Sequence, residues 1–153
     1  IKAADIWNDK KQEDLKSFIL SHSKKQSPER KLRNELLAIQ YKLEDYIASD
    51  KIDQKLRVLD FVKMYLKVLG VNQKSLAKFF EMQESNLHKY LAGQRKLNTD
   101  IAFKLSAFSH TEPEYWLRIE IKNELLEVEQ EKKKVSEYQK YDYRNLLVAE
   151  GAE

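Results

Sequence analysis

The chain has 153 residues, with 28 Lys and Arg, 25 Asp and Glu and no Cys, which excludes disulfides and Cys-based zinc sites. Only 3 Gly and 2 Pro are present, so the composition argues against an all-β or loop-rich fold and favours an all-α one. No stretch approaches the roughly 18 consecutive apolar residues of a membrane span, and we expect no membrane partner and a cytoplasmic location. The first residue is Ile1 rather than Met, so we expect further residues upstream of it.

The net charge of +3 is unevenly distributed along the chain. Residues 51–97 carry ten basic and four acidic side chains, whereas residues 98–153 carry eight basic and twelve acidic ones. A basic block beside an acidic one suggests that one face meets a polyanion while another meets solvent or protein. A chance distribution of surface charge gives the same pattern, so charge alone leaves both interpretations open.

Two helices are expected in the first third of the chain. The first covers residues 11–22, where apolar positions are sparse, and the second covers residues 28–48, after the start signal Ser27-Pro28. The second repeats an apolar side chain every three or four residues, at Leu32, Leu36, Ile39, Leu43 and Tyr46. We therefore expect residues 1–50 to form an N-terminal helical extension.

Three further helices are expected next, over residues 54–69, 73–80 and 84–91. Asp53 is expected to cap the first of them, and a three-residue break separates the second from the third. Two short helices joined by such a break form the helix-turn-helix layout, with the small Ala77 where they cross. The apolar side chains expected to anchor this pair are Leu66, Leu69, Leu76, Phe80, Leu87, Leu91 and Leu105.

Two more helices complete the expected fold, over residues 99–108 and 113–135. Thr111 is expected to start the longer one through a capping box with the glutamate three residues later. A domain over residues 51–126 would then contain the helix-turn-helix. Residues 127–153 would continue the last helix into a tail.

Aromatic side chains near the C-terminal end each allow two interpretations. Trp116 fits a core position against Phe103 and Leu105, with a partner interface as the less favoured alternative. Three tyrosines further along could form an interface patch or could dock on the rest of the chain, and the sequence favours neither: Tyr138, Tyr141 and Tyr143.

The outward positions of residues 84–91 carry polar side chains of the kind that a major-groove reader requires. The candidates for contacts with base edges are Gln83, Glu84, Ser85, His88 and Lys89. The candidates for contacts with phosphates are Gln73, Lys74, Gln94, Arg95 and Lys96. His88 suits an ordinary exposed surface position equally well.

One run of sequence carries a resemblance to a known family. It comprises Gly93 to Asn98, Asp100 to Ser106, and Thr111 to Leu117 with the sequence TEPEYWL. On this run, residues 55–126 resemble an XRE-type, lambda-repressor-like helix-turn-helix domain, and more narrowly the HigA-type plasmid-maintenance antidote (antitoxin) family. The resemblance implies a five-helix, all-α domain that binds double-stranded DNA as a homodimer on an inverted repeat. It also implies a RelE-like ribonuclease toxin as a candidate partner.

Three features depart from the family pattern. Glu81 stands where the turn usually has Gly, and a non-glycine residue is disfavoured at positive φ by about 1 kcal/mol or more, so a differently shaped turn is expected. Gln83 replaces the usual Ser or Thr at the start of the next helix and is a weaker cap. Residues 1–50 have no counterpart in the compact antidote proteins.

The sequence thus predicts a sequence-specific DNA-binding transcriptional regulator, and more narrowly an antitoxin-like autorepressor with dimer contacts on its acidic last helix. The alternative is a protein-interaction module that keeps the helix-turn-helix scaffold without reading DNA, supported by Glu81 and Glu84 on the presumed DNA side. No enzymatic activity, cofactor or metal site is expected. The chain shows no catalytic constellation, no phosphate-binding Gly-rich loop and no His, Asp and Glu set at ligand spacing.

Overall fold

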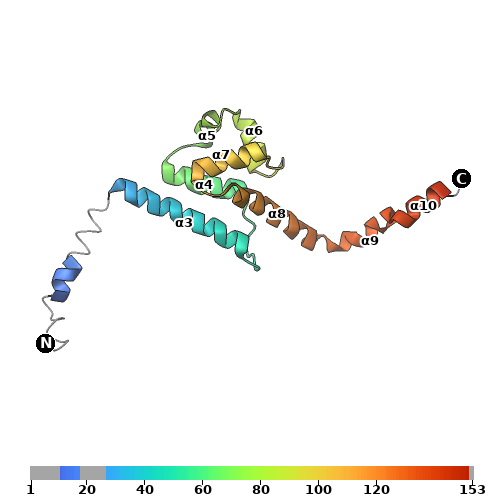
Figure 1. Ribbon diagram of the computed structural model, residues 1–153, viewed down its shortest axis with the longest axis horizontal. Helices are drawn as coiled ribbons and strands as arrows, with labels where there is room; N and C mark the ends of the chain where they lie inside the picture. The colour runs from blue at the N-terminus through green and yellow to red at the C-terminus, as the bar shows by residue number, and fades with distance from the viewer. Residues whose placement is uncertain (1–10, 18–26, 152–153) are drawn as a thin grey trace. The chain divides into compact units, whose positions relative to one another are not determined.

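The computed structural model describes residues 11–17 and 27–151, and every regular element in these residues is a helix (Figure 1). This confirms the prediction of an all-α fold. The main helices are α3 (Pro28–Ala48), α4 (Val58–Leu69), α5 (Gln73–Phe79), α6 (Glu84–Leu91), α7 (Thr99–Ser109) and α8 (Pro113–Gln130). They are followed by the 3-10 turn η1 (Lys132–Lys134), α9 (Val135–Tyr138), the 3-10 turn η2 (Gln139–Tyr141) and α10 (Tyr143–Gly151). Among the described helices, none is long and apolar enough to cross a membrane.

The chain divides into two compact units, which cover Ile1–Ala38 and Ile39–Glu153. In the first unit, residues 11–17 are helical, while residues 18–22 of the predicted helix lie outside the described residues. α3 starts as predicted, because the Ser27 hydroxyl accepts the Arg30 amide at 3.2 Å.

The last turns of α3 belong to the second unit, through the buried side chains of Ile39, Leu43 and Tyr46. These three positions of the predicted apolar stripe are therefore confirmed as core positions. The division between the units consequently falls earlier in the chain than the boundary expected after residue 50.

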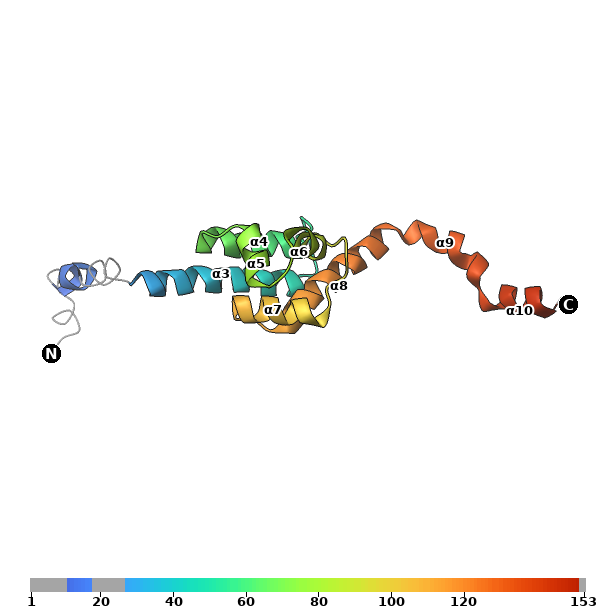
Figure 2. The ribbon, with the colours of Figure 1, turned by 90° about the horizontal axis from the view of Figure 1, so that it is seen from above.

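Within the second unit, the end of α3 and the helices α4 to α8 surround one apolar core. α5 and α6 pack against each other, and α6 packs on α4 (Figure 2). Ala77 is 1% exposed, as expected for a small residue at a close helix crossing. Most of the predicted anchors are buried, whereas Leu69 is half-buried. The buried anchors are Leu66, Leu76, Phe80, Leu87, Leu91 and Leu105.

A buried polar cluster joins the end of α3, the segment before α4, and α8. The Tyr46 hydroxyl donates to Asn123 Oδ1 at 2.5 Å and accepts the Leu56 amide at 3.1 Å. Asn123 Nδ2 donates to the Leu56 carbonyl at 2.8 Å. The cluster therefore satisfies both backbone groups of Leu56 through side chains from two distant parts of the sequence.

α4 begins later than the predicted helix over residues 54–69. Because Leu56 is bound by the polar cluster, the residues before Val58 do not take part in the helix. The predicted cap at Asp53 is wrong, since the Asp60 carboxylate accepts the Arg57 amide at 2.7 Å instead.

The predicted capping box at Thr111 is also wrong. The Thr111 side chain is buried, and its hydroxyl accepts the Trp116 indole N–H at 2.9 Å. It also bonds to the Ser109 hydroxyl at 2.6 Å, so it is committed to the core rather than to the backbone of α8. α8 starts instead with Pro113 at its first position, where the missing N–H of proline costs nothing.

Trp116 is fully buried, which confirms its predicted core position. Its aromatic neighbour is Tyr65, with ring centroids 6.2 Å apart. The predicted contact with Phe103 is wrong, because this side chain is 62% exposed. Ile101 and Leu105 occupy the inward face of α7, and the helical period turns Phe103 away from that face.

The turn between α5 and α6 has the shape that a glycine would give it. Glu81 adopts φ 59°, so the expectation of a differently shaped turn is wrong. The Met82 amide donates to the Ala77 carbonyl at 2.9 Å, and the Glu81 amide donates to the Lys78 carbonyl at 3.1 Å. These bonds close the end of α5 and hold Glu81 in a conformation that costs roughly 1–2 kcal/mol.

The long last helix ends at Gln130 rather than at residue 135 as predicted. All side chains from residue 127 to residue 141 are exposed, so no tertiary contact stabilises further turns. The lysines of η1 (KKK) follow, and Lys132 and Lys134 pair with Glu129 and Glu131 at 3.5 and 3.2 Å. The tyrosines beyond it do not dock on the core, with exposed fractions of 60%, 70% and 71% for Tyr138, Tyr141 and Tyr143.

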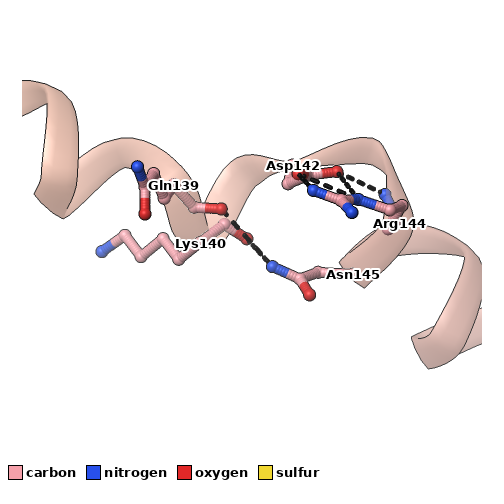
Figure 3. Close-up of polar contacts among 5 residues, drawn as sticks. All are labelled: Gln139, Lys140, Asp142, Arg144 and Asn145. Atoms are coloured by element: carbon pink, nitrogen blue, oxygen red, sulfur yellow. Dashed lines mark hydrogen bonds and ion pairs between the residues drawn. The ribbon is translucent and has the colours of Figure 1, made fainter.

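Local polar contacts shape the corner between η2 and α10 (Figure 3). Asp142 Oδ1 accepts the Arg144 amide at 2.9 Å, and the Arg144 guanidinium pairs with the same carboxylate at 2.7 Å. These bonds lower the pKa of Asp142. Asn145 Nδ2 donates to the Lys140 carbonyl at 3.1 Å. The corner is thus built without burying any apolar side chain.

Two tyrosines provide a matched test of buried hydroxyls. The Tyr65 hydroxyl is buried without a hydrogen-bond partner among the described residues, and burial raises its pKa to about 12. Tyr65→Phe should raise the free energy of unfolding by about 1 kcal/mol, because it removes an unpaired buried group. Tyr46→Phe should lower it by about 1–3 kcal/mol, because Asn123 and the Leu56 amide lose their partner. Urea denaturation measures both changes, and effects of equal sign would contradict the assignment.

Glu81→Gly should raise the free energy of unfolding by about 1 kcal/mol, because glycine adopts φ 59° without steric cost. Glu81→Ala removes the same carboxylate but keeps the strained Cβ, so it should change stability by only a few tenths of a kcal/mol. Thermal unfolding followed by circular dichroism compares the two variants. Equal effects would show that charge rather than backbone strain governs this position.

Candidate nucleic-acid interface

α6 is held with one face inward and the opposite face exposed. Leu87 and Leu91 are fully buried, which fixes the rotation of the helix about its axis. Its N-cap Gln83 makes no side-chain capping bond, as its weak capping propensity predicts. The predicted base-contact residues therefore lie outside the core, with Lys89 half-buried and the others exposed: Gln83, Glu84, Ser85 and His88.

A hydrogen bond joins the two helices of the motif on this face. Gln73 Nε2, in the first turn of α5, lies 3.1 Å from His88 Nδ1 on α6. With the Gln73 amide nitrogen as the donor, His88 Nδ1 accepts this bond. The bond links a side chain of α5 to one of α6 on this face, and it engages only Nδ1 of the His88 ring.

The loop after α6 presents the second group of predicted contacts. Gly93 adopts φ 83°, which allows the Gln94 and Arg95 amides to donate to the Lys89 carbonyl at 2.9 and 3.1 Å. The Arg95 guanidinium lies 5.9 Å from the centre of the Tyr90 ring, at cation–π distance. Arg95 is exposed, so its charge is stacked in place and still accessible to an anion.

The remaining predicted phosphate contacts differ in their surroundings. Lys74 is exposed on α5, while Lys96 forms an ion pair with Glu124 of α8, at 3.6 Å between Nζ and Oε1. The structure thus brings Gln73 and His88 into contact, and it places Gln94, Arg95 and Lys96 on one loop. Lys96 would have to leave its acidic partner to bind a phosphate.

Two residues near this surface were missed by the sequence analysis. Lys78 is exposed one turn after Lys74, and this spacing of four residues would have identified it. Glu120 binds the Leu97 amide through both carboxylate oxygens, at 3.0 and 3.2 Å. No local pattern signals a contact between residues so far apart in sequence.

The environment of Glu120 differs from that of the other carboxylates near this surface. Burial raises its pKa, the bond from the Leu97 amide opposes that effect, and the neighbouring Glu124 adds to it. Across residues 11–17 and 27–151, no group of three or more His, Cys, Asp or Glu side chains is placed to hold a metal ion. The exposed side chains of this surface thus include lysines, one arginine and neutral polar groups, together with the carboxylates of Glu81 and Glu84.

Comparison with known proteins identifies the motif independently. A family model described as a helix-turn-helix domain matches residues 10–110. Virulence-associated protein A' of Dichelobacter nodosus is 34% identical over 68 residues, which cover 44% of this chain and 59% of that relative. The chain thus spans less than two thirds of the length of this relative. No solved structure matches.

The extent of the family match bears on the organisation of the chain. It begins at residue 10, so it includes most of the region expected to be an added extension, residues 1–50. It ends at residue 110, before α8 begins at Pro113. Features of α8 are therefore features of this chain beyond the matched segment.

Proposed function

The chain belongs to the helix-turn-helix domain family, and from this premise we propose that it is a DNA-binding transcriptional regulator that recognises a specific operator. The observation that carries the proposal is the exposed polar face of α6, on a helix whose opposite face is buried. A helix presented in this way can enter the major groove and read base edges.

In the proposed complex, α6 lies in the major groove. His88, whose Nδ1 bonds to Gln73, offers its other ring nitrogen to a base edge or phosphate. The other proposed base contacts are Gln83, Glu84, Ser85 and Lys89. The proposed phosphate contacts, which set position and register, are Gln73, Lys74, Gln94, Arg95 and Lys96.

A homodimer is the proposed working unit, with its contact on α8. Ile121, Leu125 and Val128 are 54–64% exposed and follow one another by four and three residues, so they form one outward stripe. Arg118 lies towards the start of α8 and Glu129 towards its end. Arg118 pairs with Glu114 and Glu129 pairs with Lys132 within the chain, and two α8 helices packed antiparallel across a two-fold axis would replace these local partners by each other. A two-fold dimer also suits an inverted repeat.

The finer proposal is an antitoxin-like autorepressor, supported by the resemblance of TEPEYWL and the run before it to the HigA-type family. A RelE-like toxin would then be a partner. The exposed apolar side chains beyond α8 are the candidate surface for it: Val135, Tyr138, Tyr141, Tyr143, Leu146, Leu147 and Val148.

The experiment that tests DNA recognition is a fluorescence-polarisation titration with a duplex from the region upstream of the protein's own gene. A scrambled duplex of equal length and composition is the control, and both are measured at several salt concentrations. Tight binding to the native duplex alone would support an autorepressor. Weak and equal binding to both would argue against recognition of this operator.

The alternative function is a protein-interaction module on the same scaffold. Its support is a pair of exposed carboxylates on this face, Glu81 in the turn before α6 and Glu84 among the proposed base contacts. A protein of this kind would bind neither duplex even at low salt, where phosphate contacts are strongest.

Replacement of Lys74 and Arg95 by Ala should weaken DNA binding about tenfold or more and lower the slope of log Kd against log salt concentration by about 2. For each phosphate contact that is lost, DNA binding releases roughly one counterion fewer. Lys132→Ala with Lys133→Ala is the matched control, because it removes the same charge from the exposed η1. An equal loss of slope in the control would indicate a general charge effect.

Leu125→Lys should convert the proposed dimer to a monomer at micromolar concentration, because it places a charge in the outward stripe of α8. Operator affinity should fall about tenfold or more, since two half-sites are no longer bound together. Leu146→Lys on α10 is the control, with an exposed fraction of 61% against 62% for Leu125. Sedimentation equilibrium measures the mass, and a monomeric wild type would contradict the proposed dimer.

A further inference from the structure

α8 carries a row of three carboxylates, Glu120, Glu124 and Glu127, which we call the acidic row. Their spacing of four and three residues places them on one face of the helix. Each binds a group near the helix-turn-helix motif. Glu120 binds the Leu97 amide, Glu124 pairs with Lys96 at 3.6 Å, and Glu127 pairs with Lys55 at 3.0 Å.

The three contacts are not equivalent. The Lys96 and Lys55 side chains are 82% and 45% exposed in their pairs, and exposed ion pairs contribute little to stability. Glu120 is only partly exposed, and it accepts a backbone N–H through both of its oxygens. A carboxylate that accepts from a backbone amide forms a strong, charge-assisted hydrogen bond.

The bond of Glu120 acts at a particular point of the loop after α6. The loop starts at Gly93, where the Lys89 carbonyl accepts the Gln94 and Arg95 amides. It ends at Leu97, whose side chain is 8% exposed and whose amide is held by Glu120. The proposed phosphate contacts Gln94, Arg95 and Lys96 therefore lie between two anchors, one on α6 and one on α8.

We propose that Glu120 is a positioning residue that fixes the loop of residues 93–97 in the geometry required for phosphate contacts, an inference that rests on the proposed DNA-binding function. Glu124 has the opposite effect on the same loop, because it holds the Lys96 ammonium that a phosphate would otherwise bind. α8 thus sets both the position of the loop and the part of its charge that is available to DNA.

The acidic row supplies its own matched variants for a test. Glu120→Gln and Glu124→Gln remove the same charge from positions one turn apart. A pure charge effect would tighten DNA binding in both, since each removes a negative charge near the DNA. Positioning by Glu120 predicts opposite signs, with binding about threefold weaker for Glu120→Gln and about threefold tighter for Glu124→Gln.

Glu120→Ala extends the series, because it removes the acceptor that Gln retains. It should weaken binding about tenfold, and Glu127→Gln should leave binding within about twofold of the wild type. Thermal unfolding of each variant identifies any loss of the fold. If Glu120→Ala does not fold, the DNA affinity of Glu120→Gln still tests the inference.

Amide hydrogen exchange in the full chain without DNA separates this inference from the proposed function. Glu120→Ala should accelerate exchange at Leu97 by about tenfold, with smaller increases at residues 94–96, whereas Glu124→Gln should not. Unchanged exchange at Leu97 would overturn the inference whatever the DNA affinity. A wild type that binds no DNA, combined with faster exchange in Glu120→Ala, would overturn the proposed function and still support the anchoring of the loop by Glu120.

Discussion

The buried amide of Asn123 is the contact on which the arrangement of the second unit depends. It is 9% exposed and binds both the Tyr46 hydroxyl and the Leu56 carbonyl, so α8 has one rotation in which these groups are satisfied. That rotation turns Glu120 towards the loop after α6 and leaves the stripe of Ile121 and its neighbours facing outward. Lys122, next to Asn123, donates to the Ile47 carbonyl at 2.9 Å and also to the Ser49 carbonyl, and so secures the end of α3. One face of α8 therefore contacts α3 and the segment before α4, a second binds the loop after α6, and a third is exposed.

The charge of the basic block overstates the number of cations that are open to a ligand. Lys96 and Lys55 pair with Glu124 and Glu127, although both pairs are exposed enough to exchange partners at small cost. Arg95 is stacked on Tyr90 and has no carboxylate partner among the described residues. Two carboxylates from the acidic third of the sequence thus neutralise two lysines of the basic third within the folded unit. Binding of a polyanion would have to compete with the acidic row as well as with solvent.

The helices whose ends are set by local sequence signals agree closely with the ranges predicted from the sequence. α5, α6 and α7 follow the predicted ranges within one residue, because Asn72 and Asn98 cap the first and last of them and an apolar period of 3.6 residues marks all three. The predicted base-contact residues follow from the same periodicity, which shows which side of α6 faces outward. The start of α4, the role of Thr111 and the end of α8 were predicted wrongly for another reason, because they are decided by tertiary partners or by their absence. Glu120 was not predicted for the same reason, because its bond to the Leu97 amide joins residues that no local sequence pattern relates.

The two acidic residues beside the proposed base contacts have different physical meanings. Glu84 occupies the first turn of α6, where a negative charge interacts favourably with the helix dipole and compensates for the absent capping bond of Gln83. Its presence is therefore explained by folding, and it gives no separate support to a protein-interaction module. Glu81 offers no such benefit, since it sits in a strained conformation and forms no ion pair with the described residues. A glycine would serve the turn better, so stability does not explain the carboxylate of Glu81. Of the two carboxylates, Glu81 is therefore the one that supports a protein partner at this face.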